Sequence, residues 1–118
     1  MHGVKRFDNY LLPAEDLDRG RVFYRDVLGL PVKFDFSAQG FLAFRVGEEE
    51  PAIILRRQPG AKPAVWLEVD SVRLAVDALR SKGLTFLTDP FQIRTGLAVE
   101  FEDPFGNRLA LADYSKSP

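Results

Sequence analysis

The side chains that most often bind metals or attack substrates are scarce in this chain. It has one histidine, His2, and no cysteine. Imidazole and thiolate are the usual protein ligands of zinc, iron, nickel and copper, so a site of two histidines and one carboxylate cannot be assembled within one chain. His2 lies at the very start of the sequence, where an incidental terminal residue is more common than a ligand. The composition therefore predicts no disulfide, no cysteine nucleophile, no bound metal and no metal cofactor.

Four residues within apolar, strand-like runs carry groups that a small molecule could contact. Asn9 places an amide on an apolar strand, and that amide needs a partner from the fold or from a ligand. Trp66 is either ordinary core or a stacking platform. Arg56 is either a solvated strand end or an anion clamp. Glu68 is either a half-exposed strand residue or, if buried, a general base, which makes it the weak catalytic candidate.

Other chemistry is not supported by the sequence. There is no glycine-rich phosphate loop and no serine in a G-x-S-x-G setting. The acidic run "EEEP" at 48–51 is typical of an exposed turn, and "DPFGN" at 103–107 is explained as a turn built on proline and glycine. With 16 basic and 17 acidic residues the net charge is −1, which predicts no nucleic-acid partner. No apolar run approaches the roughly 20 residues that span a bilayer, so we expect no membrane association and a cytoplasmic location.

Two helices are predicted beside the strand-like runs that carry these residues. "DLDRGRVFYRDVLGL" begins at the N-cap type Asp16 and stops at Gly29, with Leu17, Gly20, Tyr24, Val27 and Leu28 at helical spacing. "DSVRLAVDALRSKGL" begins at Asp70 or Ser71 and stops at Gly83 in the same way. Each helix follows one strand-like run and precedes three others. The runs are 6–12, 31–36, 41–46, 51–57, 64–69, 84–93, 97–101 and 108–113.

The order βαβββ therefore occurs twice, which predicts an α+β fold of two paired modules. We place module one at about 4–57, a Pro/Gly linker at about 58–63 and module two at about 64–114, all within one domain. Neither half could bury its sheet alone, so the modules are expected to pair.

The motifs resemble the vicinal oxygen chelate superfamily of glyoxalases, bleomycin-resistance proteins and extradiol dioxygenases. The resemblance rests on "FYRDVLGL" (23–30), "LEVDSV" (67–72), "SKGLTFL" (81–87) and "FEDPFGNRLAL" (101–111), taken in this order over nearly the whole chain. It implies sheets curled into an open cup. In metal-dependent members the cup holds a divalent cation, and the matching ligand positions here are Asn9, Ile54, Ala64 and Ala110. All four depart from the family's pattern, and three of them carry no oxygen for an all-oxygen site either.

Strand alternation predicts what lines the cup instead. The residues that we expect to contact a ligand are Phe7, Asn9, Leu11, Ile54, Arg56, Ala64, Trp66, Arg108 and Ala110. Ala52, Glu68 and Ala112 share these faces. A mostly apolar lining with a few polar groups is typical of a small-molecule site.

The function predicted from these features is metal-free binding of an apolar or aromatic small molecule, as in bleomycin-resistance proteins. The alternative is a glyoxalase-like lyase or isomerase, or a dioxygenase-like enzyme, with a non-standard or absent metal site. A narrower variant is a metal-free enzyme that uses Glu68, Tyr10 or Tyr114 for proton transfer, and a third alternative is a scaffold without a ligand. The resemblance also implies a homodimer, in which a second subunit closes the cup.

Overall fold

The computed structural model describes residues 3–48 and 51–116. His2 and part of the "EEEP" run lie outside the described residues. The chain divides into two compact units, a first unit of Asn9–Ala64 and a second unit of the chain up to Asp8 and from Val65 onward.

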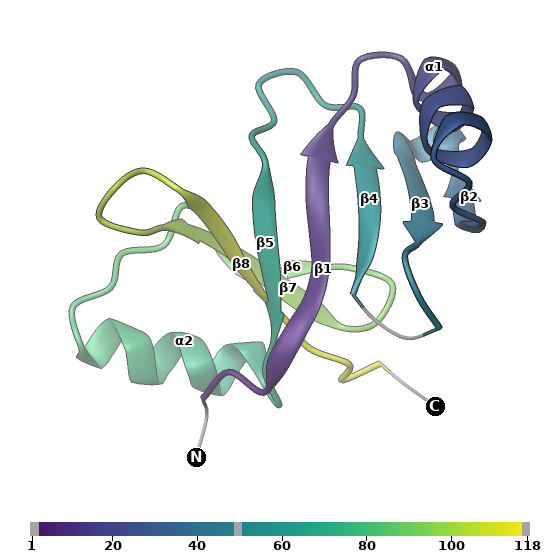
Figure 1. Ribbon diagram of the computed structural model, residues 1–118. Coiled ribbons are helices and arrows are strands. Elements are labelled where there is room, and N and C mark those ends of the chain that lie inside the picture. Colours follow the sequence, from purple (N-terminus) through teal and green to yellow (C-terminus); the bar gives the residue numbers. More distant parts are fainter. Residues whose placement is uncertain (1–2, 49–50, 117–118) are drawn as a thin grey trace. The chain divides into compact units, whose positions relative to one another are not determined.

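The first unit is a four-stranded sheet with a helix on one face (Figure 1). Its strand order is β2-β3-β4-β1, with β1 and β4 parallel and the other neighbours antiparallel. The elements are β1 (Arg6–Pro13, whose first three residues belong to the second unit), α1 (Leu17–Arg21), the π-helix η1 (Val22–Val27), β2 (Val32–Phe36), the 3-10 turn η2 (Ser37–Gln39), β3 (Phe41–Arg45) and β4 (Ala52–Arg56).

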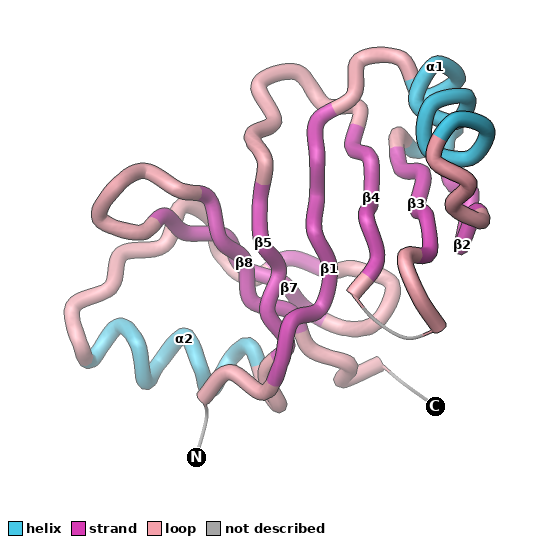
Figure 2. The backbone as a smooth tube through the Cα atoms, viewed as in Figure 1, coloured by secondary structure: helices cyan, strands magenta, loops and turns pink. Residues whose placement is uncertain are grey.

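The second unit repeats this topology. Figure 2 shows its helix α2 beside the strands β5, β7 and β8. Its strand order is β5-β8-β7-β6, which matches β1-β4-β3-β2 of the first unit. The elements are β5 (Ala64–Glu68, whose first residue belongs to the first unit), α2 (Val72–Ser81), β6 (Phe91–Gln92), β7 (Leu97–Glu102) and β8 (Arg108–Ala112). The repeated βαβββ order and the α+β class predicted from the sequence are thus confirmed.

The helix boundaries follow from the predicted caps. The Asp16 side chain accepts a hydrogen bond from the Arg19 amide at 3.1 Å, and the Ser71 hydroxyl accepts one from the Leu74 amide at 3.2 Å. Gly29 and Gly83 end the two segments with φ of 76° and 94°, a region that suits glycine. The capping prediction is confirmed at both helices.

The apolar helical spacing of the first segment does not match burial at its end. Val27 and Leu28 share this spacing with Leu17, but their exposed fractions are 67% and 51%. After Arg21 the α-helix widens into the π-helix η1, which has more residues in each turn. The 3.6-residue period therefore no longer describes which side chains face the sheet. On η1, Tyr24 still packs against the core, whereas Val27 is exposed.

One prediction fails in module two, where the run at 84–93 was expected to be one strand. Only Phe91–Gln92 forms a strand. Proline at position 90 has no amide hydrogen to donate to a ladder. The preceding residues contact β7 irregularly: the Leu87 amide donates to the Glu100 carbonyl at 2.8 Å, and the Glu100 amide donates to the Thr88 hydroxyl at 3.1 Å.

Each unit has its own core between its sheet and its helix. In the first unit the buried residues are Leu17, Leu42, Phe44 and Leu55. In the second unit they are Val69, Val72, Ala75, Val76, Val99 and Leu111. No helix within residues 3–48 and 51–116 is long and apolar enough to cross a bilayer.

Candidate functional site

The core of the first unit fixes which strand residues point away from its helix. Leu42 and Leu55 are register partners on β3 and β4 and pack in the helix-side cluster. Because side chains alternate along a strand, the neighbouring positions lie on the opposite face. Five of the predicted positions lie there: Asn9, Leu11, Ala52, Ile54 and Arg56.

This open face of the first unit also carries aromatic residues that the sequence analysis did not assign to the site. Phe36 pairs with Phe41 and Phe34 pairs with Ala43, so these side chains share the face. The rings of Phe34 and Phe36 lie 5.0 Å apart, tilted by 34°. The alternation in "VKFDF" and "FLAFRV" could have identified them, once the helix-side residues were known.

Asn9 has a structural bond on this face. Its side-chain oxygen accepts a hydrogen bond from the Ala52 amide at 3.1 Å, across the β1–β4 pair. The carboxamide oxygen is therefore engaged with the backbone, while its NH₂ group carries two donors. Phe7, earlier on β1, is 52% exposed.

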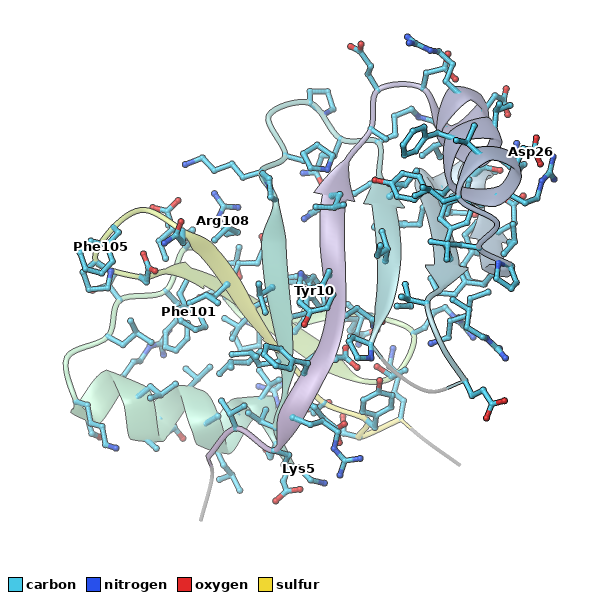
Figure 3. The ribbon with its side chains drawn as sticks, in the orientation of Figure 1. Lys5, Tyr10, Asp26, Phe101, Phe105 and Arg108 are labelled. Carbon is cyan, nitrogen blue, oxygen red and sulfur yellow. The ribbon has the colours of Figure 1, made fainter. Side chains whose placement is uncertain are left out.

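In the second unit the residues around Val99 and Leu111 face α2. Phe101, on β7, points toward the same helix (Figure 3) and packs against this core. Alternation then places Glu100 and Glu102 of β7 on the face opposite α2, where their register partners on β8 are Ala110 and Arg108. Ala98 and Ala112 form the next pair on this face. Leu67 on β5, and Val69 directly after this strand, lie on the helix side, so Ala64, Trp66 and Glu68 belong to the opposite face.

Two hydrogen-bond donors on this face are buried without a partner among the described residues. They are Nε1 of Trp66 and Nε of Arg108. Trp66 is 8% exposed, and β5 and β8 are neighbours in the sheet. A buried donor that lacks an acceptor costs about 1–3 kcal/mol of stability. Few such groups occur in native proteins, and each calls for an explanation.

Glu100 is a polar residue of this face that the sequence analysis missed. It is 7% exposed, beside the small side chain of Ala110. The signal was present in "LAVEFE", where Glu100 and Glu102 alternate with apolar Val99 and Phe101. A buried carboxylate on the face opposite α2 is a candidate for ligand binding or proton transfer.

Glu68, the weak catalytic candidate, is held by basic side chains. Its carboxylate lies 3.5 Å from the Lys5 ammonium and 3.6 Å from Arg6 Nε, and its side chain is 16% exposed. Tyr114, another proton-transfer candidate, donates its hydroxyl hydrogen to buried Asp8. Burial, together with this bond to a carboxylate, raises the pKa of Tyr114 above its ordinary value. Tyr114 is therefore a poor base near neutral pH.

The residues at the family's metal positions do not fit a metal ion. Ile54, Ala64 and Ala110 have no donor atom, and the side-chain oxygen of Asn9 is bonded to the backbone. Within residues 3–48 and 51–116, no group of three or more histidine, cysteine, aspartate or glutamate side chains could hold a metal ion.

The last hairpin has a structural explanation. Asp103 accepts hydrogen bonds from the Phe105 and Asn107 amides at 2.8 and 2.9 Å, and Gly106 has a φ of 84°. After β8, buried Asp113 accepts bonds from the Val72 and Leu97 amides. These carboxylates hold the turn and α2 in place, so the "DPFGN" hairpin needs no ligand to account for it.

Comparison with known proteins agrees with this repeated fold. A methylmalonyl-CoA epimerase from Mycobacterium tuberculosis is 17% identical with a TM-score of 0.75, over 93% of this chain and 88% of that chain. A methylmalonyl-CoA epimerase variant from Streptomyces coelicolor, in complex with 2-nitronate-propionyl-CoA, is 19% identical with a TM-score of 0.75, over 98% and 100%. A homoprotocatechuate 2,3-dioxygenase variant from Brevibacterium fuscum is 25% identical with a TM-score of 0.74, over 96% of this chain but 33% of that chain.

A search of curated protein sequences found no match. The family model of the Glyoxalase/Bleomycin resistance protein/Dioxygenase superfamily matches residues 6–111, nearly the whole chain. With the βαβββ repeat and the three structural relatives, this establishes that the chain belongs to the Glyoxalase/Bleomycin resistance protein/Dioxygenase superfamily.

Proposed function

We propose that this chain binds a small molecule with an apolar or aromatic body, without a metal. The binding surface that we propose is the face of the second unit opposite α2, around Trp66. The observation that carries the proposal is that a large indole, 8% exposed, lies on the same face of the sheet as three small side chains, Ala98, Ala110 and Ala112. A flat aromatic wall beside small side chains suits an apolar ligand.

The side chains at the family's metal positions support ligand binding that does not use a metal. Three of the four positions carry aliphatic side chains, which cannot chelate an ion but can contact a hydrocarbon. The predicted contacts of the first unit, Asn9, Leu11, Ile54 and Arg56, stay a separate prediction, and so does Phe7 on the part of β1 that belongs to the second unit.

The test is a thermal-shift series of aromatic small molecules, with and without EDTA. We expect EDTA alone to leave the melting temperature unchanged, and at least one aromatic ligand to raise it by mass action. Trp66→Phe keeps an aromatic ring at this position and is the test variant. Leu74→Phe changes an α2 side chain that is 48% exposed, and it serves as the control. Stabilisation by a divalent cation, with no response to any aromatic molecule, would refute the proposal.

A second candidate function is metal-free proton transfer, which the burial of Glu100 favours. Two of the solved relatives are epimerases by name, and a largely buried carboxylate is the type of group that such chemistry uses. Glu100→Gln removes the base while keeping the size of the side chain. Turnover of a small carbonyl substrate that is lost in Glu100→Gln would favour the enzyme, whereas ligand binding with no turnover would favour the binding protein.

We also propose that the chain forms a homodimer through the outer face of its first helix. Val22, Phe23, Val27 and Leu28 are each at least 50% exposed there. A shallow groove of about 370 Å³ runs over three of them, beside Asp18 and Arg19. The outer face of a helix is normally polar, so four exposed apolar side chains on it favour a partner.

A second copy of this chain is the partner that fits this face best. The rim is balanced in charge, with Asp18 and Asp26 against Arg19 and Arg25. In a two-fold dimer each patch meets itself, so a rim with both signs is self-complementary. A stable interface needs about 800 Å² from each subunit. The four apolar side chains would supply part of this buried area, and the charged rim would supply the rest.

Light scattering after gel filtration tests the dimer. We expect the wild type to elute as a dimer and Val27→Glu as a folded monomer, while Leu74→Glu, at an apolar position on α2 that is 48% exposed, stays dimeric. A monomeric wild type at micromolar concentration would refute the proposal.

A further inference from the structure

The face around Trp66 contains two N–H groups whose acceptors are not supplied by the described residues. These are Nε1 of Trp66 and Nε of Arg108. Both atoms are buried, and they lie on one face of neighbouring strands. Apolar contacts with a ligand do not require N–H donors. The presence of these two buried donors therefore calls for an acceptor from outside the fold.

The charges around the donors limit the kind of acceptor. Arg108 is the basic residue of this face, and its Nη2 lies 3.5 Å from the Glu102 carboxylate. Glu100 adds a second carboxylate on the same face, 7% exposed. The carboxylate of Glu68, at the end of β5, lies near Lys5 and Arg6. A ligand anion would therefore meet one guanidinium and two nearby carboxylates.

We infer that the ligand carries a neutral carbonyl oxygen, which accepts hydrogen bonds from Trp66 Nε1 and Arg108 Nε. The inference rests on the proposed function and names the polar group of its ligand. A carbonyl oxygen has two lone pairs and can accept from both donors. Being uncharged, it avoids the repulsion that a carboxylate would meet from Glu100 and Glu102.

Three probes with the same ring system separate these possibilities. They are 1-acetylnaphthalene, which has a ketone oxygen, 1-ethylnaphthalene, which has no acceptor, and 1-naphthoate, which has a charged acceptor. Trp66 is the only tryptophan, so its fluorescence reports ligand at this face directly, and calorimetry gives the dissociation constants for variants that lack it.

The ketone is expected to bind roughly five- to tenfold more tightly than 1-ethylnaphthalene, the ratio that a hydrogen bond of ordinary net strength provides. It is also expected to bind more tightly than 1-naphthoate. Trp66→Phe keeps an aromatic ring but removes the N–H, and Arg108→Lys keeps a cation beside Glu102 but removes Nε. Each should reduce the preference for the ketone, while 1-ethylnaphthalene binds about as before. Arg73→Lys, on the exposed side of α2, is the control and should leave the preference unchanged.

The remaining outcomes overturn the inference. Equal binding of ketone and hydrocarbon by the wild type would show that the two donors are not used, although the proposed function would stand. Tightest binding of 1-naphthoate would show that the acceptor is an anion. A ketone preference that survives in both variants would place the acceptor elsewhere. No binding of any probe would count against both the inference and the proposed function.

Discussion

Asp113 is the residue whose removal should most clearly destabilise the second unit. It is 1% exposed, and its carboxylate accepts hydrogen bonds from the Val72, Leu97 and Ser115 amides at 2.8, 2.9 and 3.2 Å. These bonds tie the start of α2 to the start of β7. Asp113→Ala leaves three backbone donors without this acceptor. At about 1.5 kcal/mol for each donor, the free energy of unfolding should fall by about 4–5 kcal/mol.

Thermal unfolding followed by circular dichroism measures this effect. For a domain of this size, such a loss lowers the melting temperature by roughly 10–20 °C. Asp113→Asn keeps one acceptor oxygen and should lose roughly half as much. Asp103→Ala is the matched control, because Asp103 also accepts from two amides, those of Phe105 and Asn107, but lies in an exposed turn. Water can replace its bonds, so the loss should be far smaller. Equal losses in Asp113→Ala and Asp103→Ala would refute the reasoning from burial.

The pH dependence gives a second check on Asp113. Burial by itself would raise the pKa of its carboxyl, but the hydrogen bonds from Val72, Leu97 and Ser115 outweigh it and hold the pKa below its ordinary value. The resulting stabilisation is therefore complete above the pKa of the unfolded chain, near 3.9, and is lost as the pH falls through the lower folded value. The stability difference between wild type and Asp113→Asn should shrink below about pH 4 in urea titrations.

Three further outcomes are expected. Gly96→Ala should destabilise the chain strongly, because the added Cβ would overlap the Asp113 carboxylate. Unfolding in urea measures the effect, and an unchanged midpoint would contradict the close approach. Phe7→Ala should weaken binding of an aromatic ligand in calorimetry while leaving the melting temperature nearly unchanged, since this ring is 52% exposed; undiminished affinity would remove Phe7 from the predicted lining. Tyr114→Phe should lower stability at pH 7 through the lost bond to Asp8. Because the folded pKa of Tyr114 is raised, this difference should shrink as the pH rises above about 10, and a difference that grows there would contradict the assignment.

The sequence was informative where one local pattern determines one element. Asp16 and Ser71 act as N-caps, and Gly29 and Gly83 end their segments, as their types predict. A cap needs only its own side chain and the next turn, so no distant contact can change it. The order of strands and helices follows from the same short-range signals.

The features that were missed depend on contacts that the sequence does not encode locally. The widening after Arg21 changes the helical period, which turned Val27 and Leu28 outward. The run at 84–93 has strand-like composition, but its proline prevents regular pairing. Glu100 is the exception, because its alternation with Val99 was a local signal, which the register with Ala110 then placed on the face away from α2. The donors of Trp66 and Arg108 could not be recognised as unsatisfied before their surroundings were known.

The fluorescence of Trp66, measured with excess EDTA during titration with 1-acetylnaphthalene, tests the central claim most directly. Because the chain has one tryptophan, a change in emission reports an event at the proposed face. The account predicts saturable quenching that EDTA does not affect, with a matching rise in melting temperature. Emission that does not respond to this ligand or to other aromatic carbonyl compounds, together with stabilisation by a divalent cation, would contradict it.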